Sequence, residues 1–195
     1  IVITSAFRTP IGSLNGSLAG HSATQLGTEV IKKCIQDSKL KSDEVDMVYM
    51  GQVLQTGSGQ NPARQSAINA GINKEKTATT INQVCGSGLA AVTLGFNFLK
   101  SNDANIVIAG GQESMSRARH AYLSRTGEKK LGNNVFIDTL VNDGLTDAFS
   151  KEHMGITAEN VSRRYTVTRQ DQDQFAYQSY LKTYKAIKNN YYKNI

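Results

Sequence analysis

Short apolar runs alternate with helical periodicity in the first 115 residues of the chain. The runs typical of buried strands occupy residues 1–7, 45–54, 78–84 and 105–111. Segments with helical spacing lie between them, at residues 22–38, after a glycine-rich loop within 57–71, and at 89–101. The last of these is apolar nearly all round, so we expect that helix to be buried. The alternation predicts an α/β layer with a mixed, mostly parallel sheet covered by helices.

Helix-end signals support these assignments. Ser22 is a good N-cap for the first helix. Pro62 falls in the first turn of the second helix, and Gly71 falls just past its end. Further along the chain, Thr168 precedes acidic residues and is typical of a capped helix start.

The pattern changes near residue 116. Residues 116–150 carry glycine, asparagine and charge without a clean period, whereas residues 156–193 have helical character. The apolar anchors predicted for this helical region are Tyr165, Phe175, Tyr177, Tyr180, Leu181, Tyr184 and Ile187. We therefore expect an α/β domain at 1–115 and part of a helical and irregular domain at 116–195. The end of the chain has no stop signal for the fold, and its start lacks an initiator Met, so we expect residues beyond both.

The charge of the chain is concentrated in its second part. The formal net charge is +6, and residues 116–195 hold thirteen Lys and Arg against eight Asp and Glu. Such a surface can attract a polyanion, either nucleic acid or a phosphate-rich small molecule, or it can simply be solvated. No apolar run approaches the roughly 20 residues of a membrane span. Two cysteines give no disulfide framework, so we expect a cytoplasmic protein.

The stretch NQVCGSGLAA, at residues 82–91, places Cys85 between a predicted strand and a predicted helix. Gly86 and Gly88 allow a sharp turn there and close backbone packing. A reactive side chain on such a turn is typical of a nucleophile elbow. The helix N-terminus favours a thiolate, and its N–H groups can bind an oxyanion. The alternative is that Cys85 packs as a small apolar side chain, as we expect for Cys34 in the middle of the first helix.

The same stretch also fits a different function. Gly86, Gly88 and Ala91 match the dinucleotide fingerprint G-x-G-x-x-A. Glu113 would be the ribose-binding acid, although it comes later than the usual spacing of about 20 residues. The three histidines, His21, His120 and His153, have no paired spacing and no nearby cysteine pair, so no metal site is expected.

Several ordered segments together resemble the thiolases, most closely the acetyl-CoA acetyltransferases, also called acetoacetyl-CoA thiolases. They span essentially the whole chain and read SAFRTPIGSLNGSLAG near the start, GQNPARQ at 59–65, NQVCGSGLAAV at 82–92, AGGQESMS at 109–116, DGLTDAF at 143–149, HMGITAENV at 153–161 and RQDQDQFA at 169–176. The resemblance implies a thiolase-like layered fold and acyl transfer by Claisen chemistry in lipid metabolism.

The resemblance also implies roles for individual residues. Cys85 would be the nucleophile that carries the acetyl group as a thioester, with its backbone N–H in the oxyanion hole. Leu145, His153 and Met154 would line the site for coenzyme A, which is a substrate here and not a bound cofactor. Residues 116–195 would begin the loop domain that covers this substrate, to which their positive charge is suited. The loop at 117–138 would join subunits of a homodimer or homotetramer, with neither nucleic acid nor membrane as partner.

A full thiolase is about twice as long, by the same resemblance. Its second half supplies a histidine in G-H-P, an asparagine in an N-E-A-F-like motif and a second cysteine in C-x-G, and none of these motifs occurs here. Cys34 lacks the C-x-G context and cannot replace that cysteine. We expect the 195 residues to be inactive alone. The alternatives are a non-catalytic fragment with an assembly role and a dinucleotide-binding α/β domain.

Overall fold

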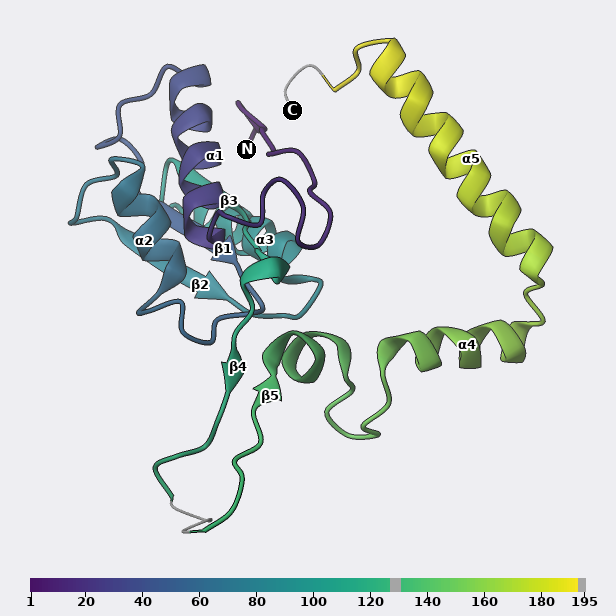
Figure 1. Cartoon of the computed structure of the whole chain (residues 1–195). Coiled ribbons are helices and arrows are strands. Elements are labelled where there is room, and N and C mark those ends of the chain that lie inside the picture. Colours follow the sequence, from purple (N-terminus) through teal and green to yellow (C-terminus); the bar gives the residue numbers. More distant parts are fainter. Residues whose placement is uncertain (127–130, 193–195) are drawn as a thin grey trace. The chain divides into compact units, whose positions relative to one another are not determined.

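The computed structural model describes residues 1–126 and 131–192 of the chain. These residues fall into two compact units, Ile1–Gly144 and Leu145–Ile195, and each unit is described by itself (Figure 1). The domain boundary expected near residue 115 stays a prediction. No helix among the described residues is long and apolar enough to cross a membrane.

The first unit is built on a parallel sheet of three strands in the order β2-β1-β3. Its strands are β1 (Met47–Gly51), β2 (Thr77–Ile81) and β3 (Val107–Gly111). The register is even, because Gly51 at the end of β1 pairs with both Ile81 and Gly111. All three carboxyl ends therefore meet at one edge of the sheet. The predicted α/β class with a parallel sheet is confirmed.

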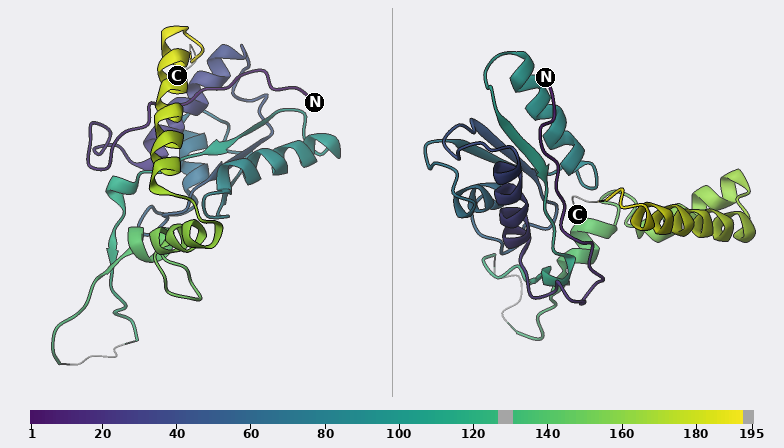
Figure 2. Two further views of the ribbon diagram at one scale, coloured as in Figure 1. Left: turned by 90° about the vertical axis from the view of Figure 1, so that its right-hand side faces the viewer. Right: turned by 90° about the horizontal axis from the view of Figure 1, so that it is seen from above.

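Helices cover both faces of this sheet. The apolar core lies on the face of α1 (Ala23–Asp37) and α2 (Pro62–Asn69), where Ile31 and Ala63 pack with Val48 of β1. On the other face Tyr49 stacks on Phe98 of α3 (Ser87–Lys100), with ring centroids 5.6 Å apart. Figure 2 shows α3 on the opposite side of the sheet from α1 and α2. The alternation of Val48 and Tyr49 follows from the two-residue repeat of a strand.

The predicted helix ends are confirmed in the first unit. Ser22 caps α1, and Gln25 completes a capping box by accepting the Ser22 N–H. Pro62 occupies the first turn of α2, after an Asn61 cap. Gly71 follows α2 with a φ of +92°, a left-handed conformation that glycine adopts without steric cost.

Residues 1–7 do not form the strand that their apolar pattern predicts. They have no regular secondary structure, and Ile1, Val2 and Ile3 are largely exposed. A strand needs a hydrogen-bonding neighbour, and the described sheet contains only β1, β2 and β3. The prediction is wrong for the described structure because a strand depends on a distant partner, which periodicity cannot supply.

The prediction that the helix at 89–101 is buried is also wrong. The helix itself exists as α3, but Leu89, Val92 and Phe96 are exposed, Leu89 by 74%. One side of α3 lies on the sheet, with Gly95 close to Val107. Within the described residues no other element packs on the opposite side as a covering layer.

The region after β3 is irregular, as expected. A two-residue ladder joins β4 (His120–Ala121) to β5 (Ile137–Asp138) in antiparallel register. This ladder closes the base of the loop at 117–138 that the resemblance assigns to subunit assembly. Residues 127–130 of that loop lie outside the described residues, and its role stays a prediction.

The second unit contains two helices, α4 (Met154–Tyr165) and α5 (Arg169–Lys188). The predicted helical region divides at Thr166, whose φ is +54°. Thr168 caps α5 with a capping box completed by Asp171, which confirms the predicted start. The expected apolar anchors are exposed, apart from the partly buried Leu181, and that expectation is wrong. Two helices and a turn provide no layer that could bury them.

Candidate active site

Cys85 lies in a short turn between β2 and α3, at the carboxyl edge of the parallel sheet. Its side chain is exposed. The strand, turn and helix therefore follow one another as predicted, and they present the thiol at the edge where parallel α/β sheets usually bind ligands. Cys34, by contrast, is half-buried on α1.

The residue before Cys85 has an unusual backbone. Val84 has a φ of +49°, in the left-handed region that β-branched residues rarely adopt. Its N–H donates to the Asn82 side chain over 3.0 Å. Gly86 has a φ of −80°, so the left-handed residue of the turn is the valine and not a glycine. Strain of this kind persists only where surrounding contacts impose it.

Ser87, the first residue of α3, supplies such contacts. It is only 4% exposed. Its hydroxyl accepts the Gln83 N–H over 2.8 Å and donates to the Val84 carbonyl over 2.5 Å. The Ser87 N–H donates to the same carbonyl over 3.1 Å. The Ser87 side chain thus joins the start of α3 to the two residues that precede Cys85. This role of Ser87 was not predicted from the sequence.

Glycines in the sheet allow α3 to begin so close to it. A Cβ added to Gly51 would lie 2.6 Å from the Ser87 carbonyl carbon and 2.8 Å from the Gly88 nitrogen. A Cβ added to Gly111 would lie 3.4 Å from the Gly88 Cα. A side chain at the end of β1 would therefore push α3 and its preceding turn away from the sheet, whereas one at the end of β3 would only reach ordinary van der Waals contact.

The start of α3 retains open donors. Gly86, its N-cap, makes no side-chain cap hydrogen bond. Neither the Cys85 N–H nor the Gly88 N–H donates to a main-chain carbonyl of the described residues. Unpaired N–H groups at a helix N-terminus attract negative charge, so the turn can donate hydrogen bonds to an oxyanion.

Glu113, the candidate ribose-binding acid, has a structural task instead. Its Oε2 accepts the N–H groups of Val53 and Leu54, at 2.8 and 3.3 Å. Burial raises the pKa of this carboxyl, and the N–H groups of Val53 and Leu54 oppose the rise. Oε1 is buried without a hydrogen-bond partner among the described residues. A carboxylate engaged in this way gives the dinucleotide interpretation no support.

Three buried polar side chains connect this edge of the sheet to the helices. The Ser66 hydroxyl donates to Gln112 over 2.6 Å, and Gln112 donates to Gln52 over 2.9 Å. Gln112 comes so close to α1 that a Cβ on Gly27 would overlap it. The two glutamines directly follow β1 and β3, so the network fixes both strand ends that lie beneath the Cys85 turn.

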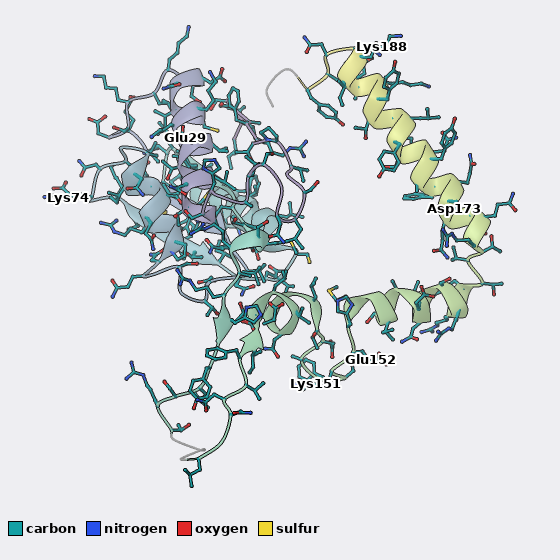
Figure 3. All side chains as sticks on the ribbon, viewed as in Figure 1. Glu29, Lys74, Lys151, Glu152, Asp173 and Lys188 are labelled. Carbon is teal, nitrogen blue, oxygen red and sulfur yellow. The ribbon has the colours of Figure 1, made fainter. Side chains whose placement is uncertain are left out.

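The other predicted site residues belong to the second unit, where a turn brings them together. Thr146 and His153 form an antiparallel bridge, and the Asp147 N–H donates to the Glu152 carbonyl over 2.9 Å. Lys151 and Glu152 lie in this turn (Figure 3). The bridge places Leu145 and Met154 on adjoining segments, next to Thr146 and His153.

Asp147 stabilises this turn from within. Its Oδ1 accepts the N–H groups of Ser150 and Phe149, at 2.6 and 2.9 Å. These hydrogen bonds, that from Ser150 first, lower the pKa of the Asp147 carboxyl. The turn therefore keeps its shape at neutral pH, where the carboxylate is ionised.

His153 caps α4 with its imidazole. Nδ1 accepts the Gly155 N–H over 3.0 Å. An accepting Nδ1 carries no proton, so in the neutral ring the proton lies on Nε2, which can donate outward. His153 and Met154 are both exposed. The other two histidines, His21 and His120, belong to the first unit. Across residues 1–126 and 131–192, no three His, Cys, Asp or Glu side chains gather as metal ligands.

Comparison with known proteins agrees with this fold. Residues 1–195 match the family described as "Thiolase, N-terminal domain". The chain therefore belongs to the thiolase family, which confirms the predicted resemblance.

The chain is 51% identical over 195 residues to the "Probable acetyl-CoA acetyltransferase" of Escherichia coli K12, covering 100% of this chain and 49% of that protein. It is 50% identical over 188 residues to the "Acetyl-CoA acetyltransferase" of Rhizobium meliloti, covering 96% and 48%. The chain spans about half the length of the curated relatives that it matches.

Proposed function

We propose that the full-length protein containing this chain is an acetyl-CoA acetyltransferase that interconverts two acetyl-CoA with acetoacetyl-CoA and CoA. The family and the names of its relatives support this reaction class. The observation that carries the proposal is the exposed Cys85 thiol on a constrained turn at the start of α3.

In the proposed reaction the Cys85 thiolate attacks the thioester carbonyl of acetyl-CoA. The CoA thiolate leaves and takes up a proton, and an acetyl-Cys85 thioester remains. The enolate of a second acetyl-CoA then attacks this thioester, forming acetoacetyl-CoA and freeing the Cys85 thiolate. The oxyanion of each tetrahedral intermediate receives a hydrogen bond from the Cys85 N–H, which is consistent with that group having no main-chain acceptor among the described residues.

The second unit contributes the substrate contacts in this proposal. Leu145 and Met154 present apolar surface to the pantetheine arm, and His153 offers Nε2–H to its amide or to the thioester. The excess positive charge of residues 116–195 is suited to the phosphates of coenzyme A. The acid–base groups that the reaction needs come from outside these 195 residues, as the resemblance implies. Subunits associate through the loop at 117–138 into dimers or tetramers.

The test replaces each cysteine in the full-length protein and follows acetyl exchange between acetyl-CoA and labelled CoA. Cys85→Ala and Cys85→Ser remove the nucleophile, so exchange should fall by on the order of a thousandfold or more. Cys34→Ala is the matched control, because Cys34 is half-buried on α1 and should leave exchange unchanged. Near-normal exchange in either Cys85 variant would refute the nucleophile role.

A further inference from the structure

The structure assigns to Ser87 the role of a positioning residue, whose hydroxyl holds the turn that aims Cys85. This inference rests on the proposed function of Cys85 as nucleophile. Ser87 hydrogen-bonds to the main chain of Gln83 and Val84. Through these two residues it acts on the thiol and the N–H of Cys85, which follows Val84.

The turn needs such a constraint because of Val84. A left-handed φ is unfavourable for a β-branched side chain, and the turn would relax without opposing contacts. Relaxation of Val84 would rotate the peptide that joins it to Cys85. Both the direction of the thiol and that of the Cys85 N–H would change.

The Ser87 hydroxyl opposes this relaxation by holding the N–H of Gln83 and the carbonyl of Val84, the two residues before Cys85. Gln83 loses the acceptor of its N–H without that hydroxyl, and the Val84 carbonyl loses one of its two donors. An N–H that loses its partner at a partly buried site is as unfavourable as the left-handed φ of Val84. The hydroxyl is therefore strong enough to decide which conformation the turn adopts.

Ser87 is itself fixed, which makes it a firm anchor. Only 4% of it is exposed, and the absence of a Cβ on Gly51 lets it rest directly on the end of β1. Movement of Ser87 toward the sheet is blocked, and movement away from it would pull the start of α3 off β1. The position of the nucleophile is in this way tied to the end of β1.

The test is the Ser87→Ala variant of the full-length protein. Misplacing a nucleophile by about 1 Å costs on the order of a hundredfold in rate, so kcat should fall by about that factor. KM for acetyl-CoA should stay close to that of the wild type, because Ser87 is buried and the substrate contacts proposed above come from the second unit. Wild-type kcat in Ser87→Ala would overturn the inference.

Two further variants separate positioning from general stability. Thr28→Val also removes a buried hydroxyl with a hydrogen-bonded partner, the Thr24 carbonyl of α1 at 2.7 Å, but away from the turn, and it should leave kcat unchanged. Val84→Gly removes the strain that Ser87 opposes, since glycine adopts positive φ freely. Adding Val84→Gly to Ser87→Ala should therefore restore most of the lost kcat. An equal loss of kcat in Thr28→Val, or no restoration by Val84→Gly, would show that Ser87 is merely structural.

Hydrogen exchange tests the effect of Ser87 on the turn without depending on the proposed function of Cys85. The main-chain N–H of Gln83 should exchange at least about tenfold faster in Ser87→Ala than in the wild type, because it loses its hydrogen-bond acceptor. The exchange rate of the main-chain N–H of Gln112, which donates to the Gly51 carbonyl, should not change. If Cys85→Ala keeps its activity, the proposed function fails while Gln83 exchange still reports on Ser87. If Gln83 exchange is unaltered by Ser87→Ala, the inference about Ser87 fails while the nucleophile role stands.

Discussion

At the residue scale, one acidic side chain stabilises each of two opposite edges of the sheet. At the amino edge, Asp46 accepts the N–H groups of Asn105 and Ile106, at 2.8 and 3.1 Å, and pairs with Lys76. These hydrogen bonds, that from Asn105 first, lower the pKa of Asp46. At the carboxyl edge, burial raises the pKa of Glu113. Both side chains join segments that are far apart in sequence, so each fixes the spacing of the strands.

Replacing Asp46 by Asn should destabilise the protein in a pH-dependent way. A depressed pKa means that the ionised carboxyl contributes stability above its ordinary pKa of about 3.9, and that this contribution disappears as the pH falls through the lower, folded value. We expect a loss of about 1 kcal/mol in the free energy of unfolding at pH 7, less than the roughly 1.5–3 kcal/mol usual for hydrogen bonds to a charge, because the Asp46 side chain is partly solvated. Urea unfolding should show the difference shrinking toward pH 3.

Asp43→Asn is the matched control, because Asp43 is an exposed acid in the turn that precedes Asp46. It should leave the free energy of unfolding unchanged at both pH values. A loss for Asp46→Asn that stays constant from pH 7 to pH 3 would contradict the assigned cause.

The element that matters most for the site is α3. Its first turn lies on glycines of β1 and β3, and Tyr49 stacks on its Phe98. Its outer side, with Leu89 and Phe96, is exposed in the described structure. The inner contacts alone therefore set where α3 begins, and with it the place of Cys85.

Replacing Gly51 by Ala should displace the start of α3. The new Cβ would lie within 2.6 Å of Ser87, a main-chain contact that cannot yield by side-chain rotation. Overpacking of this kind costs about 1–3 kcal/mol in the free energy of unfolding, and acetyl exchange in the full-length protein should fall as well. Gly20→Ala is the control, since a Cβ there meets nothing within 4 Å. Wild-type stability and exchange in Gly51→Ala would contradict the close packing described above.

At the scale of the whole molecule, local sequence signals predicted the helices and their ends. Contacts between residues far apart in sequence determined the features that were not predicted. Ser22, Pro62 and Gly71 mark helix ends through their own chemistry, so the sequence was enough to place them. The left-handed backbone of Val84 was not predictable, because it depends on Ser87 resting on a neighbouring strand. The exposure of residues 1–7 and of the outer side of α3 likewise depends on which elements cover them.

Among the residues proposed to act on the substrate, Cys85 belongs to the first unit, and Leu145, His153 and Met154 belong to the second. The family match covers all 195 residues, yet the chain spans about half of its curated relatives. The central proposal, that Cys85 carries the acetyl group, concerns a residue of the first unit.

That claim is tested most directly by locating the acetyl group. The full-length protein is mixed with acetyl-CoA, quenched in acid after a fraction of a turnover, digested and analysed by mass spectrometry. We predict a thioester-linked acetyl group on the peptide that contains Cys85, absent from the Cys85→Ala variant and unaffected by Cys34→Ala. An active protein whose acetyl group is found on another residue, or on none, would contradict the account.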